Sequence, residues 1–407
     1  MRTDELFQLI ESGEDSGVEF KSDAVQNHEL ARELVSFLNL EGGVVLLGVE
    51  DDGTIAGTTR PKLEEWIAEL CRRKIDPPII PYLTWVKDAA PGKDVLAVRV
   101  PVGPDKPYAR LHNDRRTYYI RVGSTCREAG RDELERMFQA AGRVQYGLKP
   151  VPGSGLGDLD RPRLRDYFTR VLAQECPDDH DDAGWLRLLC NVEFMTQSSG
   201  QLTATVDGML LFGRHPKRFL PQSGVRAIAY QGERADYAAR ADEELAGPMT
   251  PLFDHNGRRV SGGLVEESLY FVGRHTISTA WIDPGGQRVD RPAYPHDVLR
   301  EAIVNALVHR DYSIVGTDIS LCLYSDRLEI ESPGRLPNTA TVEALKSGFR
   351  YARNQTLVNV LRDYKYVDYR GMGIRSKIIP GMKAHNGTEP DFVDKPHSFL
   401  VRLWLNG

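Results

Sequence analysis

An acid, an amide and an imidazole recur at intervals of four residues in the C-terminal third of the chain. They are Glu301, Asn305 and His309, within the otherwise apolar segment 297–312. If this segment is a helix, the spacing places the three side chains in one file along it. A helix that is apolar nearly all round is normally buried, and buried polar groups need partners. The file therefore predicts either a network with neighbouring backbone or a ligand site.

A second group of chemically capable residues lies near the N-terminus, at Glu14, Glu19, Lys21 and Asp51. Residues 18–21 alternate as in a half-buried strand, which directs Glu19 and Lys21 to one face. Glu14 can fold back beside Glu19, and Asp51 follows a neighbouring strand. Together they could hold a divalent cation and position a water for attack on a phosphodiester. The alternative is an exposed ion pair, worth less than about 1 kcal/mol, beside an ordinary turn.

The N-terminal group requires a lobe in which helices and strands alternate. Helical periodicity over residues 29–40 stops at the glycine pair 42–43, and an apolar strand follows over 44–49. A tight turn is expected at 51–53. The other elements expected in this lobe are a helix over 61–74, strands over 94–101 and 117–122, and a helix over 131–141.

The remainder of the chain divides at a stretch rich in proline and glycine, residues 149–157. The last section is expected to run helix, strand, strand, helix and strand, at 297–312, 317–324, 327–332, 354–362 and 398–405. These patterns predict an α/β (α+β) protein. Its expected parts are a lobe over 1–145, a linker and middle region over 146–290, and a C-terminal domain over 291–407.

Bulk composition excludes several classes of protein. The net charge of −6 and the pI near 6.0 give no overall attraction to nucleic acid, so such binding needs a local basic patch. The sequence contains no secretory signal and no apolar run long enough to span a membrane. The five cysteines lack CxxC spacing, which argues against a disulfide framework and a zinc site. We expect a cytoplasmic protein without a membrane partner.

The N-terminal lobe resembles the Schlafen/AlbA-type domain. The resemblance rests on EDSGVEFK at 14–21, FLNLEGGVVLLGVED at 37–51 and YYIRVGS at 118–124. In Schlafen proteins, two glutamates and an aspartate in this arrangement form a metal-dependent endoribonuclease site. The resemblance implies a mixed-sheet lobe in which Glu14, Glu19 and Asp51 bind Mg²⁺ or Mn²⁺, with Lys21 beside them. Many bacterial relatives are known only as nucleic-acid-binding or regulatory modules. Schlafen nucleases grip RNA with paired lobes, so a single lobe would form a homo-oligomer or act alone.

Basic and aromatic residues are interleaved in the same lobe, a pattern that suits phosphate contacts and stacking with single-stranded nucleic acid. The candidate contacts for RNA or DNA are Arg72, Arg73, Lys74, Arg115, Arg116, Tyr119 and Arg121, together with Tyr108, Tyr118 and Arg127. The alternative is that these basic side chains are simply solvated. Binding through them is predicted to be modest and to weaken steeply with salt.

The C-terminal file resembles the first motif of the GHKL ATPase fold. The wider resemblance is to the divergent GHKL-like domain often labelled as a RecG helicase C-terminus, and it includes EAIVNALVHRDY at 301–312 and DRLEIESPGRLP at 326–337. It implies an α/β sandwich that binds ATP, in which Glu301 activates water and Asn305 binds the magnesium on the phosphates.

The same resemblance assigns further residues to a nucleotide pocket. These are His309, Ser332, Gly334, Gly371 and Gly373, with Arg353 and Asn354 in a later motif. The two C-terminal glycines would let backbone amides approach phosphates. GHKL proteins read adenine with an aspartate, and the matching position here is Ser332, which offers only a weaker contact. Weak ATP binding, altered base preference and loss of binding are the alternatives.

Three functions follow from these patterns. The first is a nucleic-acid-binding, metal-dependent RNA or DNA endonuclease with a regulatory nucleotide-binding domain, which uses Mg²⁺ or Mn²⁺ and ATP. The second is a non-catalytic ATP-binding regulator of transcription or defence, and the third is a weak GHKL-type ATPase. No GxxxxGK[ST] loop is present, which argues against a helicase motor. The sequence ends at Gly407 without room for a winged helix, which lowers the expectation of a promoter-specific repressor.

Overall fold

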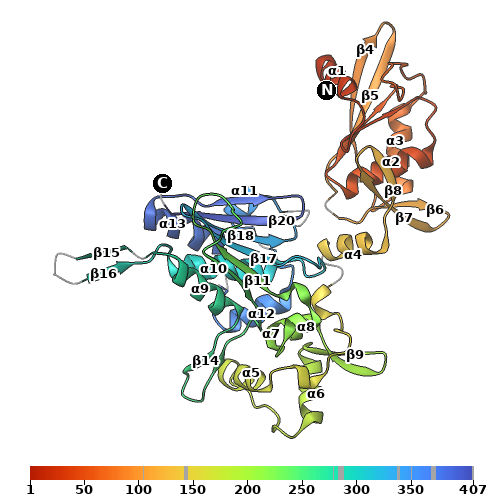
Figure 1. Cartoon of the computed structure of the whole chain (residues 1–407). Coiled ribbons are helices and arrows are strands. Elements are labelled where there is room, and N and C mark those ends of the chain that lie inside the picture. The colour runs from red at the N-terminus through yellow and green to blue at the C-terminus, as the bar shows by residue number, and fades with distance from the viewer. Residues whose placement is uncertain are drawn as a thin grey trace. The chain divides into compact units, whose positions relative to one another are not determined.

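The computed structural model describes residues 1–103, 105–141, 145–277, 279–282, 288–336, 340–349, 351–367 and 373–405. The chain separates into two compact units, Met1–Val144 and Gln145–Gly407. Helices and strands are mixed in both units, which confirms the predicted α/β (α+β) class (Figure 1). No helix among the described residues is long and apolar enough to cross a membrane.

The N-terminal unit contains two four-stranded sheets, with the orders β1-β2-β5-β4 and β3-β6-β7-β8. β1 and β2 are parallel, whereas the other pairs are antiparallel. The strands are β1 (Val18–Lys21), β2 (Gly43–Leu47), β3 (Ile75–Asp76), β4 (Tyr82–Ala90), β5 (Lys93–Val100), β6 (Ala109–His112), β7 (Arg115–Val122) and β8 (Thr125–Glu128). The helices are α1 (Thr3–Ser12), α2 (Asn27–Asn39), α3 (Leu63–Lys74) and α4 (Arg131–Ala140).

The first sheet is covered on both faces, which explains why β2 is apolar at every position. Val45 and Leu47 pack in the cluster formed by α2 and α3, whereas Val44 and Leu46 pack with Leu6 of α1. Successive side chains of a strand point to opposite faces, so a strand between two layers has no polar face.

The second unit is built on a six-stranded sheet with the order β12-β11-β17-β18-β20-β19. β11 and β17 are parallel, and the other neighbours are antiparallel. Its strands are β11 (Val225–Ala229), β12 (Ala241–Leu245), β17 (Ile319–Leu323), β18 (Arg327–Pro333), β19 (Asp391–Asp394) and β20 (Ser398–Trp404). β11 therefore brings residues of the segment 146–290 into the same sheet as residues of 291–407.

Helices and short hairpins surround this sheet. The α-helices are α5 (Arg161–Asp166), α6 (Asp182–Asn191), α7 (Val206–Phe212), α8 (Pro216–Phe219), α9 (Leu264–His275), α10 (His296–His309), α11 (Val342–Ser347), α12 (Gln355–Asp363) and α13 (Ile379–Asn386). Shorter helical turns are η1 (Tyr146–Leu148), η2 (Leu156–Asp158), η3 (Tyr167–Val171), η4 (Pro221–Ser223) and η5 (Ile374–Ile378). The hairpins are β9 (Met195–Ser198) with β10 (Gln201–Ala204), β13 (Leu252–Phe253) with β14 (Arg259–Ser261), and β15 (Thr279–Ile282) with β16 (Arg288–Arg291).

Helix α10 is buried along most of its surface, as its composition predicts, and it packs against β18. It ends at His309, so the three residues after His309, which the sequence pattern included in the helix, lie beyond its end. The side-chain amide of Asn354 donates to the carbonyl oxygens of Val308 and Arg310, at 2.9 and 2.8 Å. These bonds satisfy acceptors that the end of the helix leaves without a helical partner.

Candidate functional site

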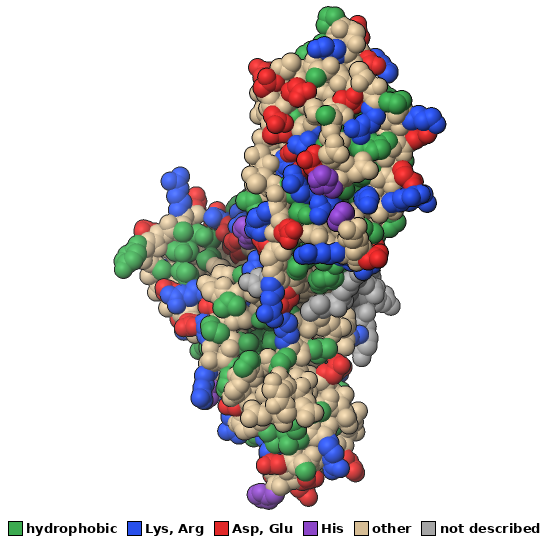
Figure 2. Space-filling view, turned by 90° about the vertical axis from the view of Figure 1, so that its right-hand side faces the viewer, with side chains coloured by type: hydrophobic (Ala, Val, Ile, Leu, Met, Phe, Trp, Pro, Cys, Tyr) green, Lys and Arg blue, Asp and Glu red, His purple; other side chains and the backbone are tan. Residues whose placement is uncertain are grey.

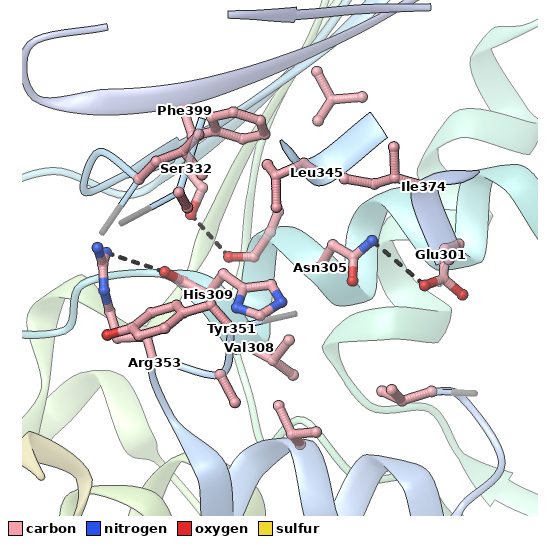
Figure 3. Close-up of a pocket in the computed structure, with 18 of the residues that line it drawn as sticks. Glu301, Asn305, Val308, His309, Ser332, Leu345, Tyr351, Arg353, Ile374 and Phe399 are labelled. Carbon is pink, nitrogen blue, oxygen red and sulfur yellow. Dashed lines mark hydrogen bonds between the residues drawn. The ribbon is translucent and has the colours of Figure 1, made fainter. Parts of the chain in front are cut away.

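A cavity of about 460 Å³ is lined by α10, by the strands β18 and β20 and by the segments around α11, α12 and η5 (Figure 3). Its lining includes six of the residues that the sequence assigned to a nucleotide pocket, namely Glu301, Asn305, His309, Ser332, Gly334 and Gly373. The remaining one, Gly371, lies outside the described residues. The fold therefore gathers residues from three separate motifs around one cavity.

The alternation of β18 explains how Ser332 reaches this cavity. Leu328, Ile330 and Ser332 are buried on the face that α10 covers, whereas Glu329 and Glu331 lie on the other face and are partly exposed. Side chains two residues apart share a face of a strand, so Ser332 extends the apolar row toward the helix.

The cavity combines an apolar wall with basic side chains. Much of the wall comes from residues that the motifs did not single out, namely Leu345, Phe349, Tyr351, Val358, Ile374, Phe399 and Val401. Among the described lining residues, the cations are Arg335, Arg353 and Arg362 and the only carboxylate is that of Glu301. Such a lining suits an anionic ligand with an apolar part.

Glu301 is held tightly at one end of the cavity, where it is 4% exposed. The amide nitrogen of Asn305 lies 3.4 Å from its Oε1, and Lys377 Nζ lies 3.4 Å from its Oε2. A Cβ at Gly373 would lie 1.7 Å from the same Oε1. Only glycine therefore allows the chain to pass this close to the carboxylate while Glu301 keeps its position.

His309 lies one helical turn beyond Asn305 and is uncharged at neutral pH. Its burial, together with the nearby guanidinium of Arg353, lowers the pKa of His309 to about 4. Arg353 is fixed by donation to the carbonyl oxygens of His309 at 3.1 Å and Arg335 at 2.6 Å. A neutral imidazole offers a cavity ligand one donor and one acceptor.

Gly334 lets the chain turn sharply where β18 ends. Its φ of +105° is a conformation that other residues rarely adopt. A Cβ there would lie 2.1 Å from Nη1 of Arg353 and 2.6 Å from Cβ of Asp311. Glycine at this position therefore allows Arg353 to reach its two carbonyl partners.

The N-terminal residues that the sequence predicted as metal ligands are not gathered into one cluster in the described part of the structure. Glu19 pairs with Arg121 at 2.5 Å and with Lys21, while Glu14 accepts the backbone N–H of Phe20 at 2.8 Å. Asp51 is exposed on its turn. Throughout the described part of the chain, no group of three or more His, Cys, Asp or Glu side chains is placed to hold a metal ion. The carboxylates of Glu19 and Glu14 are engaged with protein cations and a backbone amide, so in this arrangement these two residues do not fit a bound divalent cation.

These residues instead satisfy the outer edge of β1, which is the end strand of its sheet. The Phe20 N–H reaches Glu14, and the Phe20 carbonyl oxygen accepts from Lys21 Nζ at 2.9 Å. The Val18 carbonyl oxygen accepts from Arg121 at 3.1 Å. Two members of the predicted catalytic group, Glu14 and Lys21, are therefore bonded to the backbone of β1.

Arg121 joins three elements through a buried ion network, and sequence reasoning missed one of its members. Its guanidinium also donates to Glu33 of α2 at 3.1 Å, and Arg32 donates to the same carboxylate at 2.8 Å. Burial, and secondly the negative charge of Glu19, raise the pKa of Glu33. The available signal was a charged residue on the buried side of the predicted helix 29–40.

Several predicted nucleic-acid contacts are unsuited to that role. Arg121 and Tyr119 are buried, with 4% and 5% of their surface exposed, so neither can meet a phosphate or a base. Their burial therefore argues against the predicted contacts. Tyr108 is buried too, because it lies in the core formed by α2 and α3.

The other basic candidates lie nearer the surface, and most have acidic partners. Arg72 and Arg73 pair with Glu69, Arg116 pairs with Asp76, and Arg127 pairs with Glu133. Arg115 is exposed and Lys74 is half-buried. On the face of the N-terminal unit that Figure 2 presents, acidic and basic side chains are interspersed.

Comparison with protein families finds two matches. Residues 14–130 match the family "Schlafen, AlbA_2", and residues 316–403 match "Putative ATP-dependent DNA helicase recG C-terminal". The chain contains a Schlafen AlbA_2 domain and a RecG-type C-terminal domain. Together these domains suggest a nucleic-acid-related protein with an ATPase-like domain. The second match begins after α10, so it does not include Glu301, Asn305 or His309.

Two solved structures resemble the chain distantly. The DIP2311 protein from Corynebacterium diphtheriae is 20% identical, with 96% of this chain and 75% of that chain covered and a TM-score of 0.44. The N-terminal domain of a DNA helicase RecG-related protein from Nitrosomonas europaea is 23% identical, with 32% and 93% covered and a TM-score of 0.25. A comparison with curated proteins finds no match.

Proposed function

We propose that this chain is a nucleotide-responsive regulator that binds nucleic acid through its N-terminal unit and ATP through its C-terminal cavity. The observation that carries the proposal is the cavity of about 460 Å³, which collects Glu301, Asn305, His309, Ser332, Gly334 and Gly373 from distant parts of the sequence. A concave, partly apolar cavity into which a few polar side chains converge is the usual form of a small-molecule site.

The chemistry of the lining supports a nucleoside triphosphate. Arg335 and Arg353 supply positive charge for phosphates, and the apolar wall suits a base. The side-chain oxygen of Asn305 is a suitable ligand for the Mg²⁺ that accompanies ATP. Asn305 would hold this cation from α10, and the cation would supply positive charge for the phosphates.

The nucleic-acid part of the proposal rests on the Schlafen AlbA_2 domain and on the exposed basic residues of α3 and β7. Since Arg72 and Arg73 share Glu69, phosphate binding must compete with an internal ion pair. We therefore expect modest affinity for RNA or DNA that weakens as salt is added.

Cleavage of nucleic acid is not part of this proposal. Glu19 is paired with Arg121 and Lys21, and Asp51 lies apart on an exposed turn. A cation at this position would have to displace two protein cations from a buried carboxylate, which is costly.

A slow ATPase is the second candidate, because Glu301 lines the cavity as an activating base would. Its carboxylate is already in contact with Asn305 and Lys377, so we expect turnover to be slow. Phosphate release that disappears in Glu301→Gln, while ATP binding persists, would support this activity.

Calorimetric titration of the full chain with ATP and Mg²⁺ tests the nucleotide site. We expect saturable binding of ATP. The affinity should weaken at least about tenfold in Asn305→Ala, because this variant loses one charge-assisted contact. Asn256→Ala removes the same side chain from an exposed loop and should leave the affinity unchanged. Absence of ATP binding by the unaltered protein would refute the proposal.

Incubation with labelled RNA, single-stranded DNA and duplex DNA in Mg²⁺ or Mn²⁺ tests the N-terminal unit. We expect salt-dependent binding and intact nucleic acid. Asp51→Asn is the informative variant, because an exposed residue can be changed without disturbing the fold. Cleavage by the unaltered protein that disappears in Asp51→Asn would overturn the regulator proposal and support the predicted nuclease.

A further inference from the structure

The sheet forms an apolar floor at one end of the C-terminal cavity. In the register of β18 and β20, Ile330 lies opposite Val401 and Ser332 lies opposite Phe399. All four line the cavity, and Figure 3 draws Leu345 beside Ser332 and Phe399. Paired side chains on one face of neighbouring strands are close enough to form a continuous surface. A flat apolar ring, such as a nucleotide base, therefore fits here.

Ser332 is the polar side chain of this floor, and its hydroxyl proton is already used. Oγ donates to the carbonyl oxygen of Ala306 in α10 at 2.8 Å, and the residue is 6% exposed. A base that lies beside Ser332 can donate only to the lone pairs of a neutral hydroxyl. A neutral hydrogen bond of this kind changes an affinity by about two- to tenfold.

The carboxylate of Glu301, which also lines the cavity, lies away from this floor (Figure 3). Glu301 precedes Ala306 by five residues, which is about 7 Å along a helix axis, and Figure 3 shows it on the side of the cavity away from Ser332. It is also the only carboxylate among the lining residues for which coordinates are described, and it contacts Asn305 and Lys377. Among the residues that the structure describes, none places a charged acceptor for a base amino group at the floor.

We propose that this pocket binds purine nucleoside triphosphates without selecting for the exocyclic amino group of the base, an inference that rests on the proposed nucleotide site. Affinity comes from the phosphates and from burial of the ring. Sites built to hydrogen-bond a substrate group reject the analogue that lacks it by about 10⁴-fold. This floor offers one neutral hydrogen bond. The dissociation constants of nucleotides with and without the amino group should therefore differ by less than about tenfold.

Titration of the full chain with ATP and with inosine triphosphate tests the inference. The two share their sugar and phosphates, but inosine carries an oxygen in place of the adenine 6-amino group. We expect dissociation constants that differ by less than about tenfold. A larger preference for ATP would overturn the inference and leave the nucleotide site intact. Binding of neither nucleotide would refute the proposed function, and the inference would fail with it.

Two serine variants test whether the Ser332 hydroxyl contributes to selectivity for the base. Ser332→Ala should change the ratio of the ATP and inosine triphosphate affinities by less than about twofold to threefold. Ser268→Ala is the matched control, because Ser268 is also buried and its hydroxyl donates to the carbonyl oxygen of Leu264 at 2.7 Å, but Ser268 does not line the cavity. Loss of ATP affinity alone in Ser332→Ala, with Ser268→Ala unaffected, would contradict the inference.

Discussion

The guanidinium of Arg121 donates to the carboxylate of Glu19 at 2.5 Å, and the two side chains are 0% and 7% exposed. The pair joins β7 to β1, and the second carboxylate partner, Glu33, extends the connection to α2. An arginine between two buried acids compensates charge that would otherwise be costly to bury. In this unit, the residues that resemble a catalytic centre serve the packing of the sheet.

Replacing Arg121 should therefore destabilise the N-terminal unit strongly. Arg121→Met leaves two buried carboxylates without their shared cation, and we expect a loss of about 3–5 kcal/mol in the free energy of unfolding. Arg116→Met breaks an exposed pair with Asp76 and should cost less than about 1 kcal/mol. Urea denaturation at pH 7 measures both. Equal losses in the two variants would show that the buried network adds no stability.

The Arg121→Met defect should also depend on pH. Burial and Glu19 raise the pKa of Glu33, so ionisation of Glu33 costs stability as the pH rises through its folded pKa. At lower pH the acids are protonated more readily, and the missing cation matters less. We expect a smaller difference between variant and unaltered protein at pH 4.5 than at pH 7. The same difference at both pH values would argue against uncompensated carboxylates.

His309 should make the second unit less stable in mild acid. Its pKa is lowered from 6.5 to about 4, so below pH 6.5 the unfolded chain takes up a proton that the folded state resists. Stability should fall as the pH drops from about 6.5 to about 4, by about 2 kcal/mol at pH 5. Thermal unfolding of the unaltered protein and of His309→Asn across this range measures the effect. A pH dependence that persists unchanged in His309→Asn would assign it to other groups.

Gly334 should tolerate alanine less well than a glycine with comparable backbone geometry. Gly334→Ala combines a positive φ with a Cβ contact of 2.1 Å to Arg353, whereas Gly387 has φ +79° and open space around its Cβ position. We expect Gly387→Ala to cost about 1 kcal/mol from backbone strain alone. Gly334→Ala should cost more and weaken ATP binding, because Arg353 must move. Chemical denaturation and calorimetry test both effects, and equal behaviour of the two variants would contradict them.

Neutralising Glu69 should strengthen binding to nucleic acid. Glu69→Gln releases Arg72 and Arg73 from an exposed ion pair, and we expect the affinity for single-stranded RNA or DNA to rise by about two- to fivefold. Glu65→Gln makes the same change of charge in the same helix but frees Lys62 instead. Fluorescence anisotropy at several salt concentrations compares the two. An equal rise in both variants would reflect net charge rather than contacts by these arginines.

The sequence predicted elements whose pattern is local. The helix α2, the strand β2 and the helix α10 follow from apolar periodicity over consecutive residues. The end of α10 was placed three residues too late, because Arg310, Asp311 and Tyr312 include no glycine or proline that would mark the end of a helix. Boundaries of this kind depend on tertiary partners such as Asn354, which lies 44 residues after Arg310.

The site residues likewise include some that local motifs predict and some whose partners are distant in the sequence. Glu301, Asn305 and Ser332 could be assigned from motifs, and they do line one cavity. The pairing of Glu19 with Arg121 could not be foreseen, because these residues are 102 positions apart and each alone resembles a functional group. The relative positions of β1 and β7 determine whether Glu19 pairs with Arg121 or is free for catalysis.

The hydrogen bonds along the outer side of β1 have one more consequence. End strands normally present unpaired amide and carbonyl groups, and such groups invite pairing with another extended chain. Here the groups of Phe20 and Val18 are occupied by Glu14, Lys21 and Arg121. Because charged side chains occupy these groups, the strand is protected against templated aggregation and domain swapping.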